Sequence, residues 1–228
     1  MFRSSVPRTF AKSSMNPNKT ALIAGSTGLV GTALLTLLLD SPVYDKVIAV
    51  GRKAPSITHP KLESLVVDFN SENSLQLPCH DVFCCLGTTI VVAGSQEKFR
   101  EVDHDYPLVL AQQTLAAGAS AFYMVSAMGA DAGSKIFYNR VKGDTENDIA
   151  GLGFQSTYFF RPSMLLGDRS AFRLGEKIGK FLMVGLDFLI PPKYKAVQAK
   201  QVAWCMLQEA QTPKTGVTIV ENDAILAA

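Results

Sequence analysis

A glycine-rich turn between an apolar run and a leucine-rich run constrains the fold of this chain more than any other feature. Thr20 to Ala24 is short and apolar, as a buried parallel strand is, and Leu29 to Asp40 is long enough for a buried helix. The glycines between them follow a Gly-x-x-Gly-x-x-Gly spacing. Such a turn also occurs without a ligand, but at a strand–helix junction it lets the backbone approach a pyrophosphate. The sequence therefore predicts a dinucleotide site at Gly25, Ser26, Thr27, Gly28, Leu29, Val30 and Gly31.

The rest of the chain alternates apolar runs with helical stretches, which is the pattern of a doubly wound parallel sheet. Further strands are predicted at Lys46 to Val50, Leu65 to Asp68, Asp81 to Leu86, Ala121 to Ser126 and Ser156 to Phe160. Helices are predicted over Gln96 to Ala117, with a kink or break at Pro107, and over Lys135 to Ala150.

The last third of the chain changes character. Helices are predicted near Ala171 to Phe188 and Ala199 to Ala210, and a final strand near Val217 to Val220. We expect one α/β domain over residues 20–228, a Rossmann-type doubly wound parallel sheet with a small C-terminal lobe over about residues 163–228.

The first 19 residues differ from the rest in charge. They contain Arg3, Arg8, Lys12 and Lys19 and no acid, so the remainder of a chain with formal net charge +2 is slightly acidic. This basic, serine-rich composition is typical of a mitochondrial presequence, of an unstructured leader, or of a start placed too early, since Met15 could serve. We expect residues 1–19 to be flexible and the protein to be cytoplasmic, or mitochondrial if the leader is a presequence.

Charge, hydropathy and cysteine spacing exclude several classes of function. A near-neutral body gives no electrostatic reason to expect nucleic-acid binding. No run reaches the roughly 18 apolar residues of a membrane span, and the most apolar stretch, Ile178 to Pro191, contains Lys180 and Asp187. The 4 cysteines lack the spacing of metal ligands, so a reducing compartment and no metal site are predicted.

The end of the second predicted strand indicates which nicotinamide cofactor the site prefers. An enzyme that prefers NAD usually has Asp or Glu there, which accepts hydrogen bonds from the ribose 2′-OH. This chain has Gly51, Arg52 and Lys53, and two cations with no acid suit a 2′-phosphate. Alone, Arg52 and Lys53 would be read as solvated surface charges. Beside the glycine turn they favour NADP(H) over NAD(H).

Two other strand ends supply candidate cofactor contacts. Asp68, followed by Phe69, ends the third predicted strand, where its carboxylate either reaches the adenine amino group or begins a loop. The sequence Leu86, Gly87, Thr88 ends the fourth, where a glycine allows the cofactor ribose to lie against the backbone.

Ser126, Tyr138 and Lys142 form the candidate catalytic group. Ser126 ends the fifth predicted strand, and Tyr138 and Lys142 follow on the next predicted helix, four residues apart and so on one face. An ammonium beside a phenol makes the phenol a better acid near neutral pH. Ser126 would hold a substrate carbonyl while Tyr138 delivers the proton. The alternative is an ordinary pair on a helix surface.

These residues carry a resemblance. The chain is similar to the atypical short-chain dehydrogenase/reductases, and more narrowly to the Tat-interactive-protein-like oxidoreductases, from about Lys19 to at least Asp168. The most specific pieces are ALIAGSTGLVG, FCCLGTT, EVDHDYPLVLAQ, SAMGAD, YNRVKG and FRPSMLLGDR. The resemblance implies that Ser126, Tyr138 and Lys142 are catalytic, that Lys142 also holds the nicotinamide ribose, and that Arg161 and Pro162 lie near the nicotinamide.

One residue departs from the pattern of the superfamily. Many members have an Asn in the helix after the fourth strand that supports a water relay, and the counterpart here is Asp103, which cannot donate when ionised. Cys84 and Cys85 would suit a thiol nucleophile, but inside an apolar strand they are better explained as core.

Two functions remain open. The first is an NADPH-dependent reductase of a small-molecule carbonyl, which the intact Ser, Tyr and Lys favour. The second is a regulatory protein that binds NADPH without turnover, with a protein partner or a second copy of itself, which Asp103 mildly favours. A third hypothesis, an electron-transfer or assembly factor at a membrane, is supported only by the basic leader and by the apolar stretch Ile178 to Ile190.

Overall fold

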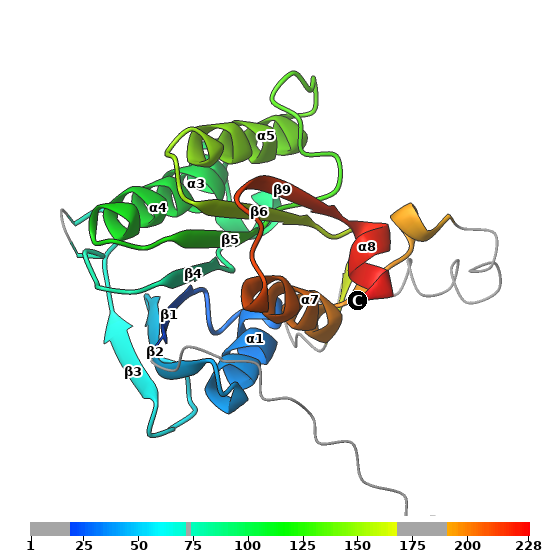
Figure 1. Ribbon diagram of the computed structural model, residues 1–228. Helices are drawn as coiled ribbons and strands as arrows, with labels where there is room; N and C mark the ends of the chain where they lie inside the picture. The colour runs from blue at the N-terminus through cyan, green and yellow to red at the C-terminus, as the bar shows by residue number, and fades with distance from the viewer. Residues whose placement is uncertain (1–18, 72–73, 168–190) are drawn as a thin grey trace, which may run out of the picture.

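Seven parallel strands form one sheet in the residues that the computed structural model describes, 19–71, 74–167 and 191–228 (Figure 1). The strands are β1 (Lys19–Ala24), β2 (Tyr44–Gly51), β3 (Leu62–Val66), β4 (Asp81–Cys84), β5 (Ala121–Val125), β6 (Ser156–Arg161) and β9 (Gly216–Glu221). Their order across the sheet is β3-β2-β1-β4-β5-β6-β9. Most of the predicted leader and the predicted helix Ala171 to Phe188 lie outside the described residues.

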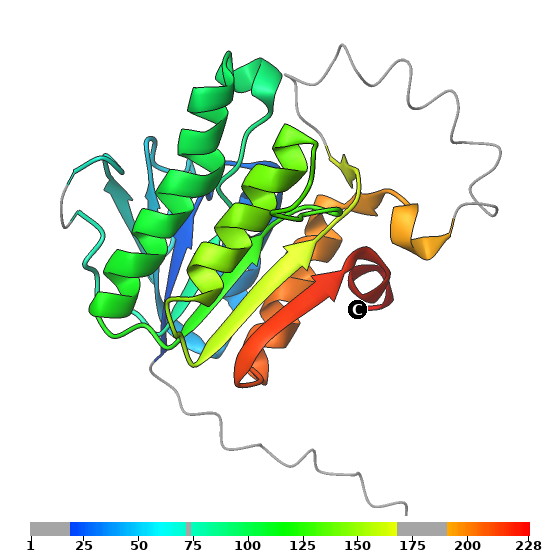
Figure 2. The same ribbon diagram turned by 90° about the horizontal axis from the view of Figure 1, so that it is seen from above.

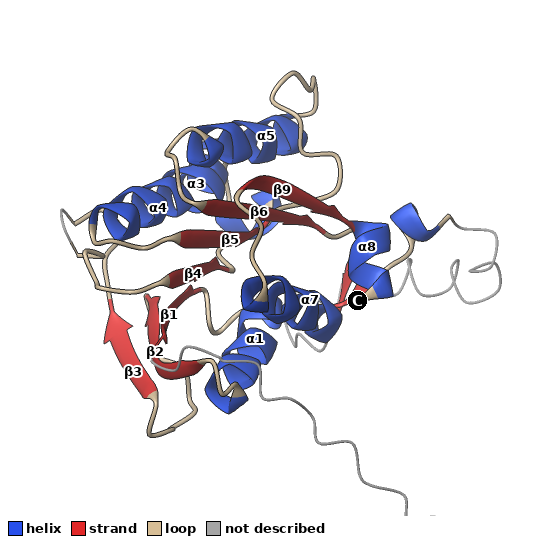
Figure 3. Cartoon of the chain, viewed as in Figure 1, coloured by secondary structure: helices blue, strands red, loops and turns tan. Residues whose placement is uncertain are grey.

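Helices cover both faces of this sheet (Figure 3). On one face α1 (Leu29–Asp40) packs against α7 (Ala199–Gln211). On the other face lie α4 (Tyr106–Ala116), preceded by α3 (Gln96–Arg100), and α5 (Phe137–Ala150) (Figure 2). Each face has its own buried apolar cluster, one shared by the strands with α1 and α7, the other by the strands with α4 and α5. The predicted Rossmann-type doubly wound sheet is confirmed.

The strand order places a crevice at the carboxyl ends of β1 and β4. From β1 the chain winds outward to β2 and β3 on one side, and then returns to β4 on the other side of β1. In open parallel sheets a ligand binds where the winding direction reverses in this way. The glycine turn follows β1, so it lies at this crevice.

The third strand begins earlier than predicted. The prediction was Leu65 to Asp68, whereas β3 spans Leu62–Val66. β3 is the edge strand of the sheet, and Glu63 and Ser64 are exposed. Because half of its side chains face solvent, an edge strand does not form a continuous apolar run in the sequence. Its first residues are therefore not recognised as strand from their hydropathy. The other predicted strands agree with the structure to within two residues at each end.

The stretch predicted as helical before β5 is divided into two helices, α3 and α4, and Pro107 lies in the first turn of α4, as the predicted break requires. A π-helical turn, η1 (Glu101–Asp105), joins the two helices, and the Tyr106 N–H donates to the carbonyl of Glu101. Pro107 has no N–H to donate to the carbonyl of Asp103 four residues earlier. The hydroxyl of Thr145 on α5 donates to that carbonyl at 3.1 Å. The hydrogen bond that Pro107 cannot donate to the Asp103 carbonyl is thus replaced by one from a neighbouring helix.

Among the described residues after Pro162, which leave out 168–190 of the predicted lobe, many belong to the sheet and its helical layers. β9 pairs with β6, and α7 covers α1. What remains apart is the two-stranded ladder of β7 (Leu165–Leu166) and β8 (Val197–Gln198), the 3-10 turn η3 (Pro192–Tyr194) and α8 (Asn222–Ala227). Together with α2 (Ile90–Ala93), these short elements were not predicted. None of the helices in the described ranges combines the length and apolar character needed to cross a membrane.

Candidate functional site

Two glycines of the turn after β1 are required by close backbone packing. Gly25 has φ 82°, and a Cβ there would lie 2.5 Å from the carbonyl oxygen of Cys85. A Cβ on Gly31 would lie 2.1 Å from the carbonyl oxygen of Gly25. Any larger residue at either position would push the turn out of shape.

The turn leads into a helix whose first N–H groups are free. Gly28 is the N-cap of α1, no side chain caps the helix, and its first turn holds no acid. The amino end of a helix carries partial positive charge and unpaired donors, which suit an anionic group such as a pyrophosphate.

A cleft of about 580 Å³ opens at the carboxyl ends of β1, β2 and β4. The predicted contacts that line it are Gly25, Ser26, Thr27, Gly28, Arg52, Lys53, Phe69, Leu86 and Gly87. The lining also includes residues that were not predicted as contacts: Val50, Gly51, Cys85, Val102 and Tyr106. Other predicted contacts are not part of this lining: Leu29, Val30, Gly31, Asp68, Thr88, Tyr138, Lys142, Arg161 and Pro162. The sequence thus located the cleft through its strand ends, and missed the contribution of η1 and α4.

Aromatic rings form one end of this cleft. Phe69 and Tyr106 stack with ring centroids 5.0 Å apart and an interplanar angle of 21°. The Tyr106 hydroxyl donates to Oε1 of Glu101 at 2.7 Å; burial and this acid raise the pKa of Tyr106. Tyr106 is the aromatic residue of the stretch EVDHDYPL, and this is the sequence signal from which a cofactor contact at Tyr106 could have been predicted.

Asp68 lies outside the cleft lining and has a local role. Its Oδ1 accepts hydrogen bonds from the Asn70 backbone N–H at 3.0 Å and from Asn70 Nδ2 at 3.3 Å. This is the geometry of an aspartate that begins a loop. Its predicted contact with adenine stays a prediction.

Lys142 forms a buried ion pair with Asp103. Its Nζ lies 2.7 Å from Oδ1 of Asp103, and both side chains are almost fully buried. Burial works to lower the pKa of Lys142, but the charge of Asp103 and the nearby Tyr138 outweigh it, so the pKa is raised. The backbone N–H of Thr88 donates to Oδ2 of Asp103 at 2.8 Å. Asp103 thus holds Lys142 charged and ties it to the end of β4.

The ammonium of Lys142 lies directly behind the cleft. Gly87 lines the cleft, and a Cβ on Gly87 would lie 3.9 Å from Nζ of Lys142. Tyr138, one helical turn earlier on α5, is partly exposed and packs against Phe99 with centroids 5.4 Å apart. Helical spacing brings Tyr138 and Lys142 to the same side of α5, close enough for Tyr138 to act on the pKa of Lys142.

Ser126 is connected by a hydrogen bond to a group of charged side chains. Its hydroxyl donates to Oε1 of Glu146, which is buried on α5. Arg161 donates to both oxygens of Glu146, from Nε to Oε1 at 3.1 Å and from Nη2 to Oε2 at 2.6 Å. Nη1 of Arg161 also contacts Oε1 of Glu221 at 3.1 Å. Of the predicted residues Ser126 and Arg161 are therefore brought together, by a glutamate that was not predicted. The hydrogen bonds that Arg161 donates to Glu146 contribute most to the raised pKa of Arg161.

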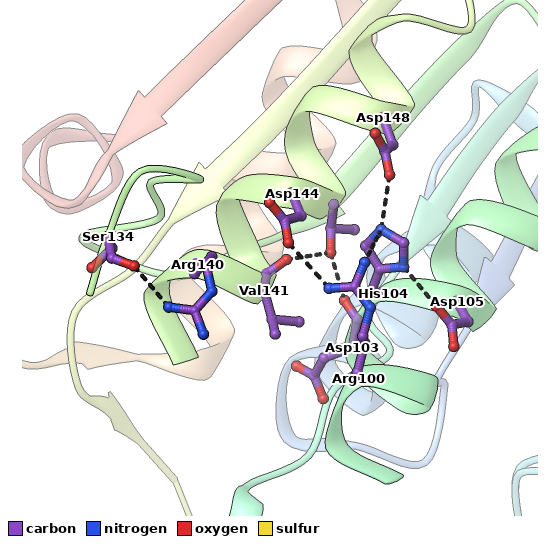
Figure 4. Close-up of polar contacts among 10 residues, drawn as sticks. Arg100, Asp103, His104, Asp105, Ser134, Arg140, Val141, Asp144 and Asp148 are labelled. Carbon is purple, nitrogen blue, oxygen red and sulfur yellow. Dashed lines mark hydrogen bonds and ion pairs between the residues drawn. The ribbon is translucent and has the colours of Figure 1, made fainter. Parts of the chain in front are cut away.

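Further polar contacts fasten α3 and η1 to α5 (Figure 4). The buried His104 has Nδ1 2.6 Å from Asp105 and Nε2 2.8 Å from Asp148. Arg100 contacts Asp144 at 3.1 Å. The π-helical turn that carries Asp103 is thereby held against the helix that carries Lys142.

The cysteines in the fourth strand do not form a nucleophilic site. Burial raises the pKa of the Cys84 thiol to about 12 and that of the Cys85 thiol well above its usual value. A nucleophilic cysteine needs its thiolate form near neutral pH, so both side chains serve packing. Within the described residues no group of His, Cys, Asp and Glu is arranged to hold a metal ion.

Comparison by sequence finds relatives that span most of the chain. It is 35% identical over 216 residues to Protein HTATIP2 of Rattus norvegicus, covering 92% of this chain and 88% of that protein. It is 31% identical over 215 residues to Protein FMP52, mitochondrial, of Meyerozyma guilliermondii, covering 90% of this chain and 93% of that protein. No protein-family model matches the chain.

Comparison with solved structures supports the fold. An oxidoreductase of the short-chain dehydrogenase/reductase family from Burkholderia thailandensis matches with a TM-score of 0.71 at 17% identity, over 92% of this chain and 94% of that one. The Bordetella bronchiseptica enzyme WbmG in complex with NAD matches with a TM-score of 0.68 at 13% identity, over 92% and 74%. The fold is that of Rossmann dehydrogenases.

Proposed function

The chain belongs to the family of HTATIP2 and FMP52 proteins, which are atypical short-chain dehydrogenase/reductases, and from this premise we propose that it is an NADP(H)-dependent oxidoreductase acting on a carbonyl or alcohol group. One observation carries the proposal. The Lys142 ammonium, held charged by Asp103, lies behind the cleft at Gly87 and one helical turn from Tyr138. A buried ammonium beside an accessible phenol is suited to proton transfer.

The residues of the cleft fit a dinucleotide. Gly25 and Gly31 leave no room for a side chain where the backbone must approach a pyrophosphate, and α1 presents uncapped N–H groups there. Bound NADP(H) would supply or take up the hydride. Val102 and the stacked Phe69 and Tyr106 give the adenine an apolar wall.

The cations after β2 favour NADP(H) over NAD(H). Arg52 and Lys53 line the cleft and are exposed at the end of β2, and neither forms an ion pair with an acid among the described residues. Free guanidinium and ammonium groups at this position suit a 2′-phosphate.

Tyr138 is the proposed proton donor and acceptor. Tyr138 is partly exposed and lies one helical turn from the charged Lys142, so it is suited to release a proton to a substrate oxygen and recover it from solvent. Lys142 would also donate to the nicotinamide ribose hydroxyls.

A second candidate function is binding of NADPH without turnover. It is favoured by the buried acids: Asp103 engages Lys142, and Glu146 engages the only proton of Ser126. Two of the three candidate catalytic groups are thus occupied by partners of the protein itself. Such a protein would use the cofactor as a structural or regulatory ligand, with a protein partner or a second copy of the chain.

A screen of aldehydes, ketones and quinones with NADPH, run beside Tyr138→Phe, separates the two functions. The oxidoreductase proposal expects turnover that Tyr138→Phe reduces by about 10²–10⁴-fold, the usual contribution of a general acid, with NADPH affinity unchanged. Equal turnover by the variant would contradict the role of Tyr138. NADPH binding with no turnover across the screen would favour the second function.

We also propose that residues 1–18, which lie outside the described part of the chain, direct import into mitochondria. The basic, acid-free composition and the mitochondrial label of the FMP52 relatives support this. A fluorescent protein fused to residues 1–30 should accumulate in mitochondria. Diffuse cytoplasmic fluorescence would favour the cytoplasmic alternative.

A further inference from the structure

The hydroxyl of Ser126 is engaged by a buried acid. Its Oγ donates to Oε1 of Glu146, and the two residues are only 5% and 4% exposed. A serine hydroxyl has one proton, and an ionised carboxylate can only accept hydrogen bonds. While Glu146 is ionised, Ser126 therefore has lone pairs, and no proton, to offer a ligand.

Arg161 holds Glu146 in this role. Its guanidinium forms a two-pronged contact with the carboxylate, at 3.1 Å and 2.6 Å. Planar, bidentate pairs of this kind fix orientation as well as charge. The guanidinium also supplies the countercharge that a buried carboxylate requires. Glu146 is thus kept as an acceptor for the Ser126 proton.

Glu146 lies on the same face of α5 as the other candidate catalytic groups. It follows Lys142 by four residues and Tyr138 by eight, which is one and about two helical turns. Ser126, at the end of β5, meets this face through Glu146. Glu146 therefore connects Ser126 to the face of α5 that carries Lys142 and Tyr138.

We propose that Glu146 is a positioning residue that makes Ser126 a hydrogen-bond acceptor, so that the site with a protonated Tyr138 binds an alcohol more tightly than the matching carbonyl compound. The proposal rests on the oxidoreductase function. An alcohol hydroxyl can donate its proton to Ser126 while it accepts from the phenol of Tyr138. A carbonyl oxygen has no proton and would face the lone pairs of Ser126. Oxidation of an alcohol needs its proton to pass to Tyr138, so the preference is one of binding and applies to the small-molecule alcohol that carbonyl reduction forms.

The first test uses Glu146→Gln with 4-nitrobenzyl alcohol and 4-nitrobenzaldehyde as the matched probes. In the variant the amide oxygen can face Arg161, and the amide nitrogen can then donate to Ser126 and free its proton. Dissociation constants are measured by calorimetry for the alcohol on the protein with NADPH and for the aldehyde on the protein with NADP⁺. Neither mixture can turn over.

The ratio of the two dissociation constants distinguishes positioning from support of the fold. The variant should shift this ratio toward the aldehyde by about five- to tenfold, the worth of one hydrogen bond. The shift should vanish in a Ser126→Ala background. Glu221→Gln is the matched control, because it removes the same charge beside Arg161 without touching Ser126. An unchanged ratio, with both probes weakened equally, would overturn the proposal.

A second test needs neither cofactor nor turnover. In Ser126→Cys, the rate of alkylation by iodoacetamide against pH gives the pKa of the introduced thiol, with peptide mass spectrometry separating it from the native cysteines. Adding Glu146→Gln should lower that pKa by about one pH unit, because a like charge at contact distance is removed. Adding Glu221→Gln should change it far less.

An identical thiol pKa with and without Glu146→Gln would overturn the positioning role, even if neither probe binds. If Glu146→Gln lowers the thiol pKa but the protein turns over no carbonyl or alcohol, the oxidoreductase function is contradicted. The contact between Ser126 and Glu146 is then still supported. The two proposals therefore fail in different ways.

Discussion

Asp103 gives Lys142 its charge at a position where many related enzymes have an asparagine. An amide would orient water and leave the ammonium without a countercharge, whereas the carboxylate contacts it at 2.7 Å and accepts from the Thr88 N–H. Because both side chains are buried, neither can rely on solvent. In this structure Asp103 is therefore the ion-pair partner of Lys142.

Replacing Asp103 with Asn should destabilise the protein, and the cost should depend on pH. Breaking a buried pair costs about 3–5 kcal/mol. The folded-state pKa of Lys142 is raised, so the stabilisation is complete at neutral pH and is lost as pH rises through that pKa. Urea unfolding at pH 7.5 and pH 11 should show the gap between wild type and variant narrowing. A gap that is constant with pH would contradict this assignment. Asp144→Asn, at a more exposed pair, is the control and should cost about 1 kcal/mol or less.

Replacing Arg52 with Glu should change cofactor preference. Loss of a charge-assisted hydrogen bond to the 2′-phosphate, with a new repulsive charge, should weaken NADPH binding by roughly ten- to a hundredfold. NADH affinity should change little, and fluorescence titration with both cofactors measures the difference. Lys214→Glu, before β9 at the opposite edge of the sheet, should leave both affinities unaltered. Unchanged NADPH affinity in Arg52→Glu would refute the NADP(H) assignment.

Helix α5 is the element on which the site is organised. It carries Tyr138, Lys142 and Glu146 on one face and is tied to η1 by Thr145 and to α3 and η1 by the polar contacts of Figure 4. Its position against the loop before it depends on Gly143. A Cβ there would lie 2.1 Å from the backbone nitrogen of Ala132.

Gly143→Ala should therefore move the loop or the helix. Forcing atoms into such a contact costs at least about 1–3 kcal/mol, which is several degrees in melting temperature for a chain of this size. Gly151→Ala, at the C-cap of the same helix, is the matched control. Its Cβ would find no atom nearer than 3.5 Å, and φ there is −69°, so stability should be kept or slightly increased. Equal melting temperatures for the two variants would contradict the close approach.

Elements with strong local patterns were predictable, and elements defined by their neighbours were not. The leucine-rich α1 and the buried strands β4, β5 and β6 agree with the sequence reading because their apolar character is local. The edge strand β3 was displaced because half of it faces solvent. The π-helical turn η1 was missed because it depends on Thr145 of another helix, which accommodates Pro107.

On the scale of the whole molecule, the sheet order decides where the site forms. Strand ends that are far apart in the sequence meet at one crevice, so the cleft could be predicted from its strands alone. The contacts that modify its chemistry could not. Ser126, Glu146, Arg161 and Glu221 lie on four different elements, and no spacing in the sequence indicates that they touch.

Binding of a dinucleotide across this crevice should stabilise the whole fold. A ligand at about 100 times its dissociation constant adds about 2.7 kcal/mol, and each kcal/mol raises the melting temperature of a domain this size by about 2–4 °C. NADPH should thus raise the melting temperature by roughly 5–10 °C, and NADH at the same concentration by much less. No shift with either cofactor would count against a dinucleotide site.

The pairing of β9 with β6 has a consequence for biogenesis. β6 is complete once Arg161 has been synthesised, yet its partner begins only at Gly216, beyond the whole of α7. During that interval the outer edge of β6, with the aromatic run Tyr158–Phe160, has no strand beside it. An open apolar edge is a template for pairing with another chain, which makes this stage of synthesis the one most exposed to aggregation. A chaperone that covers β6 until β9 arrives would act at the step where this protein most needs protection.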